Sequence, residues 1–386
     1  MKKVISDERL PIKMWLDDLE EGALEQAKNL ANLPFAYKHI ALMPDCHQGY
    51  GMPIGSVLAT TDVVIPNAVG VDIGCGMCAV KTSVTEVSKD NLKKILGIAR
   101  GKIPLGFNSH DEAQDEEFMP LLDEELHLVK KSYRRALKQI GTLGGGNHFV
   151  EIQKGSDGFI WLMIHSGSRN IGATVANHYN KTAQKMNAKF HSTVTEKMQL
   201  AFLPIETKEA KDYLKEMKYC VDFALANRKL MMDRMIESME EVLGAFEKDE
   251  MINKSHNFVA WENHFGKNVL VHRKGATRAY KDELGMIPGS QGSKSFIVKG
   301  LANPQSFNSC SHGAGRKYSR KMAQRTLDLK EEIEILNTKG VIHGLRNVSD
   351  LDEATNAYKD IDKVMENQVD LAEIMVELSP LAVLKG

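Results

Sequence analysis

The sequence predicts an α+β fold in which a β-rich mixed centre is surrounded by helices. Two textures alternate along the 386 residues: Gly- and His-rich stretches with strand-like apolar runs, and charged stretches with apolar residues three or four positions apart. The first texture covers 39–81, 141–172, 254–315 and 338–348, and the second covers 86–100, 122–140, 173–190, 207–247, 316–336 and 350–377. No Pro- or Ser-rich linker and no internal repeat separates them. We therefore expect one large domain, residues 1–386, with a helical insertion at about 173–250.

Charge and hydropathy exclude several classes of protein. Lys and Arg total 50 against 51 Asp and Glu, which excludes a non-specific basic nucleic-acid binder but leaves room for an enzyme with a local basic face. The absence of any run of 18 apolar residues and of a secretory signal predicts a soluble, cytoplasmic protein without membrane contact. The five cysteines are an odd and sparse set, which predicts reduced thiols rather than a disulfide scaffold.

The first candidate site is the segment GVDIGCGM at 70–77. Its glycines let the backbone turn tightly, so Asp72 and Cys75 could face one point. A carboxylate and a thiolate at this spacing suit a divalent ion such as Mn or Zn. Cys75 and Cys78 also form a C-x-x-C, but the second pair that a structural zinc site needs is missing. A buried free cysteine in a glycine-rich turn would explain the segment equally well.

Two further segments place a histidine at one end of a predicted strand. GTLGGGNHFVEI at 141–152 resembles a glycine-rich loop entering a strand, with His148 and Glu151 facing a metal or a nucleotide. WLMIHSGSRNIG at 161–172 ends its strand in His165, beside a Ser- and Arg-containing turn suited to an anion. An ordinary hairpin and a core histidine with one hydrogen bond are the alternatives.

The C-terminal half supplies another histidine ligand and a cluster of cations. His256 is followed by Lys274, Arg278 and Lys281, which are suited to phosphate groups unless they are merely solvated loop charges.

SHGAGR at 311–316 places His312 in a glycine-rich turn that is predicted to open a helix. Free N–H groups and the helix dipole stabilise anions there, so this imidazole is suited to attack on phosphorus. A histidine in a plain capping turn is the alternative.

Taken together, five ligand-type side chains lie in glycine-rich settings: Asp72, Cys75, His148, His165 and His256. A thiolate such as that of Cys75 can bridge two ions. A two-metal site for phosphoryl transfer is therefore the economical interpretation.

The motifs resemble those of the RtcB-type RNA-splicing ligases. The resemblance rests on MPDCHQGYGMPIG, GVDIGCGM, GGGNHFVEI, HSGSRNIG, HNF, HRKGATRA, PGSQGS, SHGAGR and the terminal LKG, which follow in the family's order from residue 43 to the last residue. It implies an RtcB-like fold around a dinuclear Mn site. One Mn ion would be held by Asp72, Cys75 and His148, and the other by Cys75, His165 and His256.

The resemblance also implies the nucleotide and its pocket. His312 would attack the α-phosphate of GTP and carry GMP. The guanylate pocket would be lined by Asn147, His148, Phe149, Val150, Glu151, His256, Asn257, Pro288, Gly289, Ser290, Gln291, Ser295, Gly313, Ala314, Gly315 and Lys385. Gln291 departs from the family pattern, in which Met is commoner, and this leaves the shape of the guanine pocket open.

The implied activity joins RNA 3′-phosphate or 2′,3′-cyclic phosphate ends to 5′-hydroxyl ends, in tRNA splicing or RNA repair, with or without an activating protein partner. Two alternatives remain: a metal-dependent phosphohydrolase with the same ligands, and a non-catalytic RNA-binding repair paralogue. We expect the RNA to cross a patch formed by Arg169, Lys274, Arg278 and Arg316.

Overall fold

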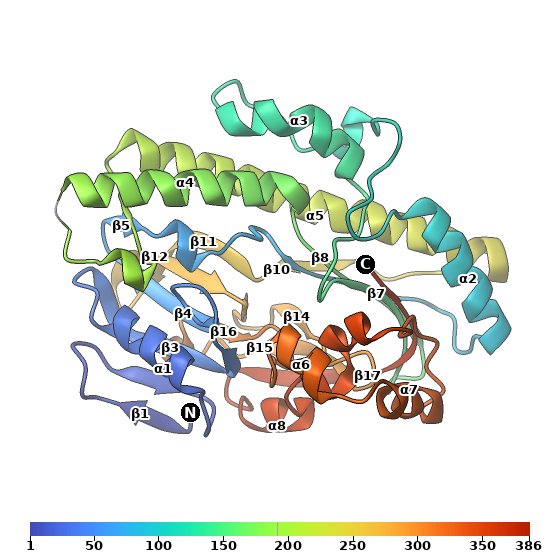
Figure 1. The fold of residues 1–386 in the computed structure, drawn as a ribbon. Helices are drawn as coiled ribbons and strands as arrows, with labels where there is room; N and C mark the ends of the chain where they lie inside the picture. Colours follow the sequence, from blue (N-terminus) through green and yellow to red (C-terminus); the bar gives the residue numbers. More distant parts are fainter. Residues whose placement is uncertain (191) are drawn as a thin grey trace.

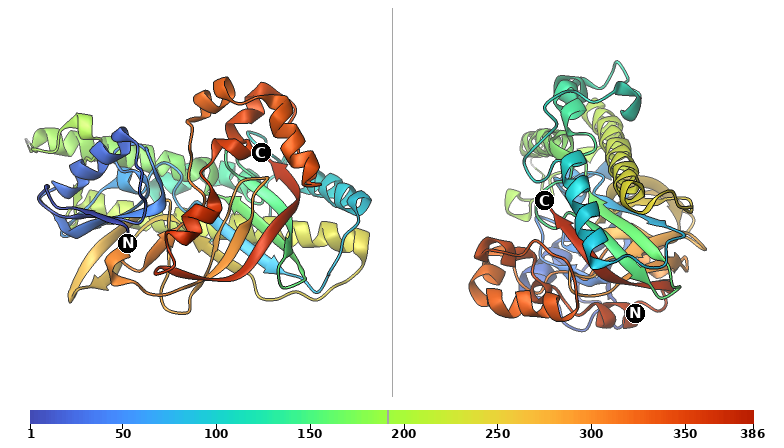
Figure 2. Two further views of the ribbon diagram at one scale, coloured as in Figure 1. Left: turned by 90° about the horizontal axis from the view of Figure 1, so that it is seen from below. Right: turned by 90° about the vertical axis from the view of Figure 1, so that its right-hand side faces the viewer.

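A computed structural model, which describes residues 1–190 and 192–386, contains two main sheets with helices packed around them (Figures 1 and 2). The smaller has the strand order β1-β2-β3-β4-β12-β11, in which only β2 and β3 are parallel. Its strands are β1 (Lys3–Ile5), β2 (Ile12–Met14), β3 (Ala36–His47), β4 (Ile54–Thr60), β12 (Lys267–Lys274) and β11 (Asn257–His264).

The larger sheet is antiparallel and has the order β10-β6-β8-β7-β17-β15-β14. Its strands are β10 (Ile252–Ser255), β6 (Gly76–Lys81), β8 (Ile160–Ser166), β7 (Phe149–Gly155), β17 (Ala372–Lys385), β15 (Ser295–Gly300) and β14 (Leu284–Ile287). Two short pairs complete the β structure: β13 (Ala276–Arg278) with β16 (Ser309–Ser311), and β5 (Val63–Val64) with β9 (Leu203–Pro204).

The helices lie on both sides of the sheets. They are α1 (Glu21–Ala31), α2 (Lys89–Lys102), α3 (His127–Gln139), α4 (Arg169–Lys189), α5 (Lys208–Leu243), α6 (Arg320–Thr326), α7 (Leu329–Thr338) and α8 (Ile361–Glu366). The 3-10 segments are η1 (Pro66–Ala68), η2 (Glu116–Phe118), η3 (Glu196–Met198), η4 (Pro304–Ser306), η5 (Val348–Glu353) and η6 (Thr355–Ala357). In Figure 1, α4 and α5 run above the sheets with α3 at the very top, and α6, α7 and α8 lie toward the bottom. Among the described residues, no helix has the length and apolarity needed to cross a bilayer.

The long helix α5 builds much of the core. It begins after Thr207, whose side chain accepts a hydrogen bond from the backbone N–H of Ala210. Met231, Met235 and Met239 are fully buried in the same apolar cluster as the strands of the larger sheet. The methionine-rich stripe is therefore core packing, as its helical spacing predicts.

The predicted α+β fold class is confirmed, and α3 and α5 fall within the stretches predicted to be helical. Helices α2 and α4 overlap their predicted stretches, but α2 ends two residues later, at Lys102, and α4 begins four residues earlier, at Arg169. The prediction was wrong for the end of 350–377, where β17 begins at Ala372, and 316–336 is divided between α6 and α7. Because β17 pairs with β7 on one side and β15 on the other, sheet pairing overrides its helix-compatible composition. The strand-like stretch 338–348 forms only an isolated bridge, and the division into domains stays a prediction.

Strand register brings distant residues to one edge of the larger sheet. Ser255 pairs with Gly76, Gly76 with Ser166, and Phe149 with both His165 and Lys385. Consequently the residues that precede β6 and β7, end β8 and follow β10 are neighbours in space. The chain then passes from β10 through residue 256 into β11, so the same point joins the two sheets.

Arg228 on α5 holds this sheet edge together through hydrogen bonds. The guanidinium is fully buried and donates to the backbone oxygens of Gly74 (2.9 Å) and Ser166 (2.8 Å). It also donates to side-chain oxygens of Asn253 (2.8 Å) and Ser255 (3.2 Å). One side chain thus ties α5 to the turn before β6, to the end of β8 and to β10.

We predict that Arg228→Met lowers the free energy of unfolding by about 2–5 kcal/mol, because buried acceptors lose their donors. Urea denaturation in the presence of a chelator measures this without a contribution from bound metal. The matched control is Lys229→Met, which removes the neighbouring exposed lysine paired with Asp233 and should change little. Equal stability of the Arg228→Met variant and the wild type would contradict the role of Arg228.

Candidate active site and metal centre

The sheet edge opens into a cleft of about 1160 Å³. This exceeds the roughly 300–1,000 Å³ of ordinary small-molecule pockets, so the cleft has room for a nucleotide and a second substrate. The predicted site residues that line it are Asp72, Cys75, Asn147, His148, Phe149, Glu151, His165, His256, Asn257, Pro288, Gly289, Ser290, Gln291, His312, Gly313, Ala314, Gly315 and Lys385.

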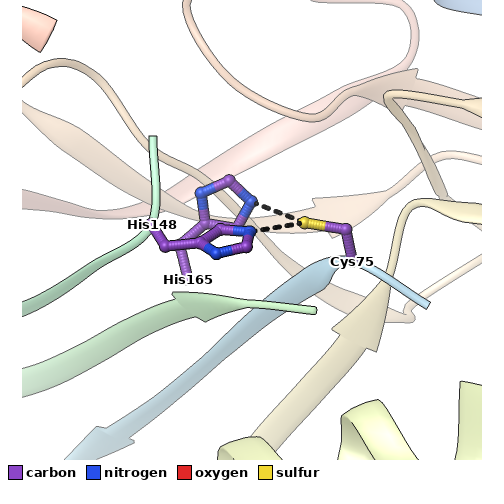
Figure 3. A group of neighbouring side chains, drawn as sticks. All are labelled: Cys75, His148 and His165. Atoms are coloured by element: carbon purple, nitrogen blue, oxygen red, sulfur yellow. Dashed lines mark hydrogen bonds between the residues drawn. The ribbon is translucent and has the colours of Figure 1, made fainter. Parts of the chain in front are cut away.

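Cys75 lies at the centre of a buried group of metal-ligand side chains. Its Sγ is 3.3 Å from Nε2 of His148 and 3.3 Å from Nε2 of His165. Figure 3 shows both imidazoles pointing toward the thiol. His148 Nε2 is in turn 3.1 Å from Asp72 Oδ2, and His165 Nε2 is 3.4 Å from His256 Nε2. The five predicted ligands therefore form one continuous chain of contacts, with the thiol in the middle.

The tautomer of His165 leaves its inner nitrogen free to bind an ion. Nδ1 donates a hydrogen bond to the backbone oxygen of Asn147 (3.1 Å), so Nε2 carries the lone pair. Nε2 of His165 faces Cys75 and the Nε2 of His256. If both nitrogens carried protons they would repel each other, whereas a cation between them could accept both lone pairs. Donor atoms about 2.0–2.3 Å from a shared ion lie roughly 3.4 Å apart, which is the spacing found here.

The electrostatics of the group also fit a divalent ion. Burial is the main reason that the pKa of the Cys75 thiol lies well above its ordinary value, and the negative charge of the Asp72 carboxylate raises it further. Burial also lowers the pKa values of His165 and His256 far below that of free histidine. The neutral imidazoles are ready ligands, and a cation would supply the charge that stabilises the thiolate. The donor set therefore fits the predicted metals.

The turn before β6 requires glycine at two positions, 74 and 76. Gly74 has a φ of +75°, which glycine adopts without strain. A side chain on Gly76 would place its Cβ 2.1 Å from the backbone oxygen of Lys254, so β10 could not approach. Asn257 then holds the turn: its side chain donates to the backbone oxygen of Asp72 (3.0 Å) and accepts from the N–H of Gly275 (2.7 Å).

His312 is held by Asp45, a residue that the sequence-based site prediction omitted. Oδ2 of Asp45 accepts from His312 Nδ1 (2.6 Å), from the backbone N–H of His312 (3.0 Å) and from that of Gly313 (3.2 Å). Burial alone would raise the pKa of Asp45, but the His312 charge and these bonds outweigh it and lower the pKa. Because the carboxylate accepts from Nδ1, the neutral tautomer with the proton on Nδ1 and the lone pair on Nε2 fits this hydrogen bond. The ring lies 4.7 Å from that of His256.

The predicted helix start at His312 was wrong. Helix α6 begins at Arg320, capped by Ser319, and Arg316 instead forms a bridge with Tyr358. Gly315 has a φ of +75°, which directs the chain away from helix. The backbone N–H groups of His312 and Gly313 donate to Asp45 and are therefore not available to an anion.

Another part of the cleft contains a buried carboxylate, that of Glu151, which could bind a nucleobase. Burial raises the pKa of Glu151 to about 7, and the Lys385 charge opposes this. Lys385 Nζ lies 6.0 Å from the centre of the Phe149 ring and 3.7 Å from Glu353, which also pairs with Arg316. Aromatic, acidic and basic groups therefore meet where the guanylate pocket was predicted.

Two predicted pocket residues lie behind the cleft rather than on its surface. Val150 packs in the apolar cluster under the larger sheet. Ser295 is buried, and its Oγ accepts from Gln153 (3.1 Å) and from the N–H of Gly289 (3.3 Å). Alternation along a strand turns Val150 away from the face that carries Phe149 and Glu151.

The predicted cationic patch is not one surface. Lys274 lines the cleft, donating to the backbone oxygens of Tyr50 (2.6 Å) and Asn67 (3.1 Å), and burial lowers its pKa to about 7. Arg278 lies outside the cleft lining and pairs with Glu283 at 2.7 Å.

The other two cations of the patch are also engaged. Arg169 donates to the backbone oxygen of Gly106 (2.6 Å), and Arg316 pairs with Glu353 (3.1 Å). The exposed cations at the cleft are Lys317, Arg320 and Lys321, of which Arg320 also pairs with Glu353 (3.3 Å); charge counting along the sequence could have found them.

Comparison with known proteins agrees with this arrangement. The family model described as tRNA-splicing ligase RtcB matches residues 26–129 and 116–386. The chain is 37% identical over 409 residues to the RNA-splicing ligase RtcB of Escherichia coli, covering 100% of this chain and 99% of the relative. It is 31% identical over 458 residues to the tRNA-splicing ligase RtcB of Methanococcus maripaludis, covering 98% and 95%.

These matches run the length of the chain and include every strand end that forms the cleft. The protein belongs to the RtcB family.

Proposed function

We propose that this protein is an RNA ligase that joins a 3′-phosphate or 2′,3′-cyclic phosphate end to a 5′-hydroxyl end, in tRNA splicing or RNA repair. It uses GTP and two Mn²⁺ ions. The observation that carries the proposal is the pairing of His312 with Asp45 directly beside the Cys75 group. The names of its relatives support RNA as the substrate.

The first step uses the free nitrogen of His312. Nε2 attacks the α-phosphorus of GTP, and the bond to the bridging oxygen breaks as pyrophosphate leaves. Because Nδ1–H stays bonded to Asp45, the carboxylate stabilises the positive charge that develops on the ring. The product is a phosphoramidate, in which GMP is bound to Nε2.

The remaining steps transfer GMP and then release it. An oxygen of the RNA 3′-phosphate attacks the GMP phosphorus, and the P–N bond breaks. The 5′-hydroxyl then attacks the activated 3′-phosphate, losing its proton as GMP leaves. A cyclic phosphate end would first be opened by water.

Asp72, Cys75 and His148 would hold one metal ion, and Cys75, His165 and His256 the other. Two bound ions would offset phosphate charge and orient the reacting oxygens. The mixture of carboxylate, thiolate and imidazole ligands is compatible with Mn²⁺.

Glu151 supports GTP rather than ATP as the nucleotide. Guanine presents an N1–H and an amine that a carboxylate can accept, whereas adenine has no N–H at N1. The carboxyl group is buried and faces the cleft near the Phe149 ring. A buried acceptor of this kind would reject the base that leaves it unpaired.

A phosphohydrolase would use the same ligands, but it would give no purpose to a histidine whose tautomer is set for attack. A non-catalytic paralogue would have no need of intact metal ligands. The contacts of His312 and Cys75 favour the ligase over both.

We predict a covalent GMP adduct on His312. Incubation with α-labelled GTP and Mn²⁺ should give an acid-labile, alkali-stable label on a denaturing gel, which His312→Ala abolishes. Asp45→Ala should slow labelling by about 100-fold or more, because the ring loses its tautomer and its partner. His178→Ala, at an exposed position on α4, is the matched control. Undiminished labelling of His312→Ala would overturn the assignment.

We predict that Cys75→Ala loses both metal ions together, since its Sγ lies between the two ligand sets. Cys78→Ala should retain them, because its thiol contacts the backbone oxygen of Arg228 instead. Elemental analysis after dialysis measures the metal content. Full occupancy in Cys75→Ala, or loss of only one ion, would exclude bridging by the thiolate.

We predict that RNA crosses the exposed cations at the start of α6. Lys317→Ala and Lys321→Ala should each weaken RNA joining and reduce the salt slope by about 0.7 for a single strand. Arg278→Ala is the matched control, since that side chain is paired with Glu283 outside the cleft. Joining rates across a salt series decide the matter: slopes equal to that of the wild type in both lysine variants would place the RNA elsewhere.

A further inference from the structure

One aromatic ring at the cleft is held out into solvent. Tyr50 lies in the turn between β3 and β4, lines the cleft, and is 73% exposed. The other aromatic side chains of the lining are less accessible: Phe149 is buried, and Tyr318 and Tyr358 are half-buried. An exposed aromatic face costs hydration free energy, so its position at a binding cleft suggests a partner that stacks.

The backbone under this ring is fixed. Gly49 exchanges two hydrogen bonds with the side chain of Gln26 on α1, at 3.1 and 2.6 Å. The Tyr50 backbone oxygen accepts from the buried Lys274 Nζ (2.6 Å) and from the N–H of Met52 (2.8 Å). The ring is therefore presented by a pre-organised turn, which lowers the entropy lost when a ligand binds.

Uncharged amide side chains line the same cleft as the ring. Asn180 and Gln184 are four residues apart on α4, so they share a helix face, and both line the cleft. The Oδ1 of Asn180 is buried and has no hydrogen-bond partner in the described part of the chain. Gln199 also lines the cleft, and its backbone oxygen would lie 2.5 Å from a Cβ on Gly51, which places it against the Tyr50 turn.

Lys274 relates this region to the reacting histidine. Its Nζ bonds to the carbonyl of Tyr50, and the next residue, Gly275, would place a Cβ 2.9 Å from the His312 ring. The backbone carbonyl of Tyr50 is thus one lysine side chain away from the turn that touches His312, and its ring lines the same cleft. A group bound on Tyr50 would belong to the nucleotide at the RNA end, or to its neighbour.

We propose that Tyr50, with Asn180, Gln184 and Gln199, forms a subsite for an unpaired nucleobase at an RNA end. The inference rests on the proposed RNA ligase function and names a contact within it. An aromatic face stacks on any base, and neutral amides can donate to or accept from its edge. The subsite therefore selects single-stranded ends with little preference for sequence, because a paired base has no free face.

The test measures binding of short single-stranded RNAs by fluorescence anisotropy, with Mn²⁺ and without GTP. One RNA ends in a 3′-phosphate and the other in a 5′-hydroxyl. Tyr50→Ala and Tyr50→Leu should weaken binding by roughly 5- to 150-fold, while Tyr50→Phe, which keeps the ring, should bind as the wild type does. Trp261→Ala removes an aromatic ring that is 53% exposed on β11, outside the cleft, and is the matched control.

Abasic RNAs identify the end that stacks. RNA that lacks the base nearest the stacked end should bind the wild type more weakly than intact RNA does. Tyr50→Ala, which has no ring to stack on, should bind the abasic and the intact RNA equally. If only the 3′-phosphate strand or only the 5′-hydroxyl strand responds, that end occupies the subsite. Equal binding by wild type, Tyr50→Ala and Tyr50→Leu would overturn the proposal.

The proposed ligase function and the Tyr50 subsite can be disproved independently. Absence of the GMP adduct and of RNA joining in the wild type would remove the proposed function itself. A wild-type protein that labels and joins RNA, with Tyr50 variants that bind RNA equally well, would remove only the subsite. Thermal unfolding of each Tyr50 variant verifies that the fold is retained.

Discussion

The register of three neighbouring strands governs the rest of the site. Because Gly76 pairs with Ser166 and Phe149 with His165, the turn before β6, the end of β8 and the start of β7 meet at one sheet edge. A slip by one residue would turn each side chain to the opposite face of the sheet. Cys75 could then no longer lie between two imidazoles, whatever the composition of the loops.

The junction of the two sheets adds the reactive half of the site. His256 lies between Ser255, the last residue of β10 in one sheet, and Asn257, the first residue of β11 in the other, and its Nε2 is 3.4 Å from that of His165. Asp45 reaches the same point from β3, 267 residues away from His312 in sequence. The metal group and the proposed nucleophile are therefore aligned by β structure, which is stiffer than a free loop would be.

Charge is distributed locally rather than globally. The net charge is −1, yet Arg228 and Lys274 are buried beside the cleft and exposed cations gather at the start of α6. Burying such groups costs free energy unless they are fully bonded, and both donate to backbone carbonyls. They order the turns that carry the proposed metal ligands and Tyr50, whereas Lys317 and Lys321 are exposed at the cleft and Arg320 pairs there with Glu353.

The sequence by itself determined the fold class, the four helices α2 to α5 and the family, because periodicity and contiguous motifs are local properties. It also predicted the metal-ligand group around Cys75, which the structure brings together. Tertiary structure alone decided that His312 pairs with Asp45, that residues 372–385 form the strand β17, and that Arg278 pairs with Glu283 outside the cleft. Each of these depends on contacts between segments far apart in the chain, and neither spacing nor propensity encodes which distant group a side chain will meet.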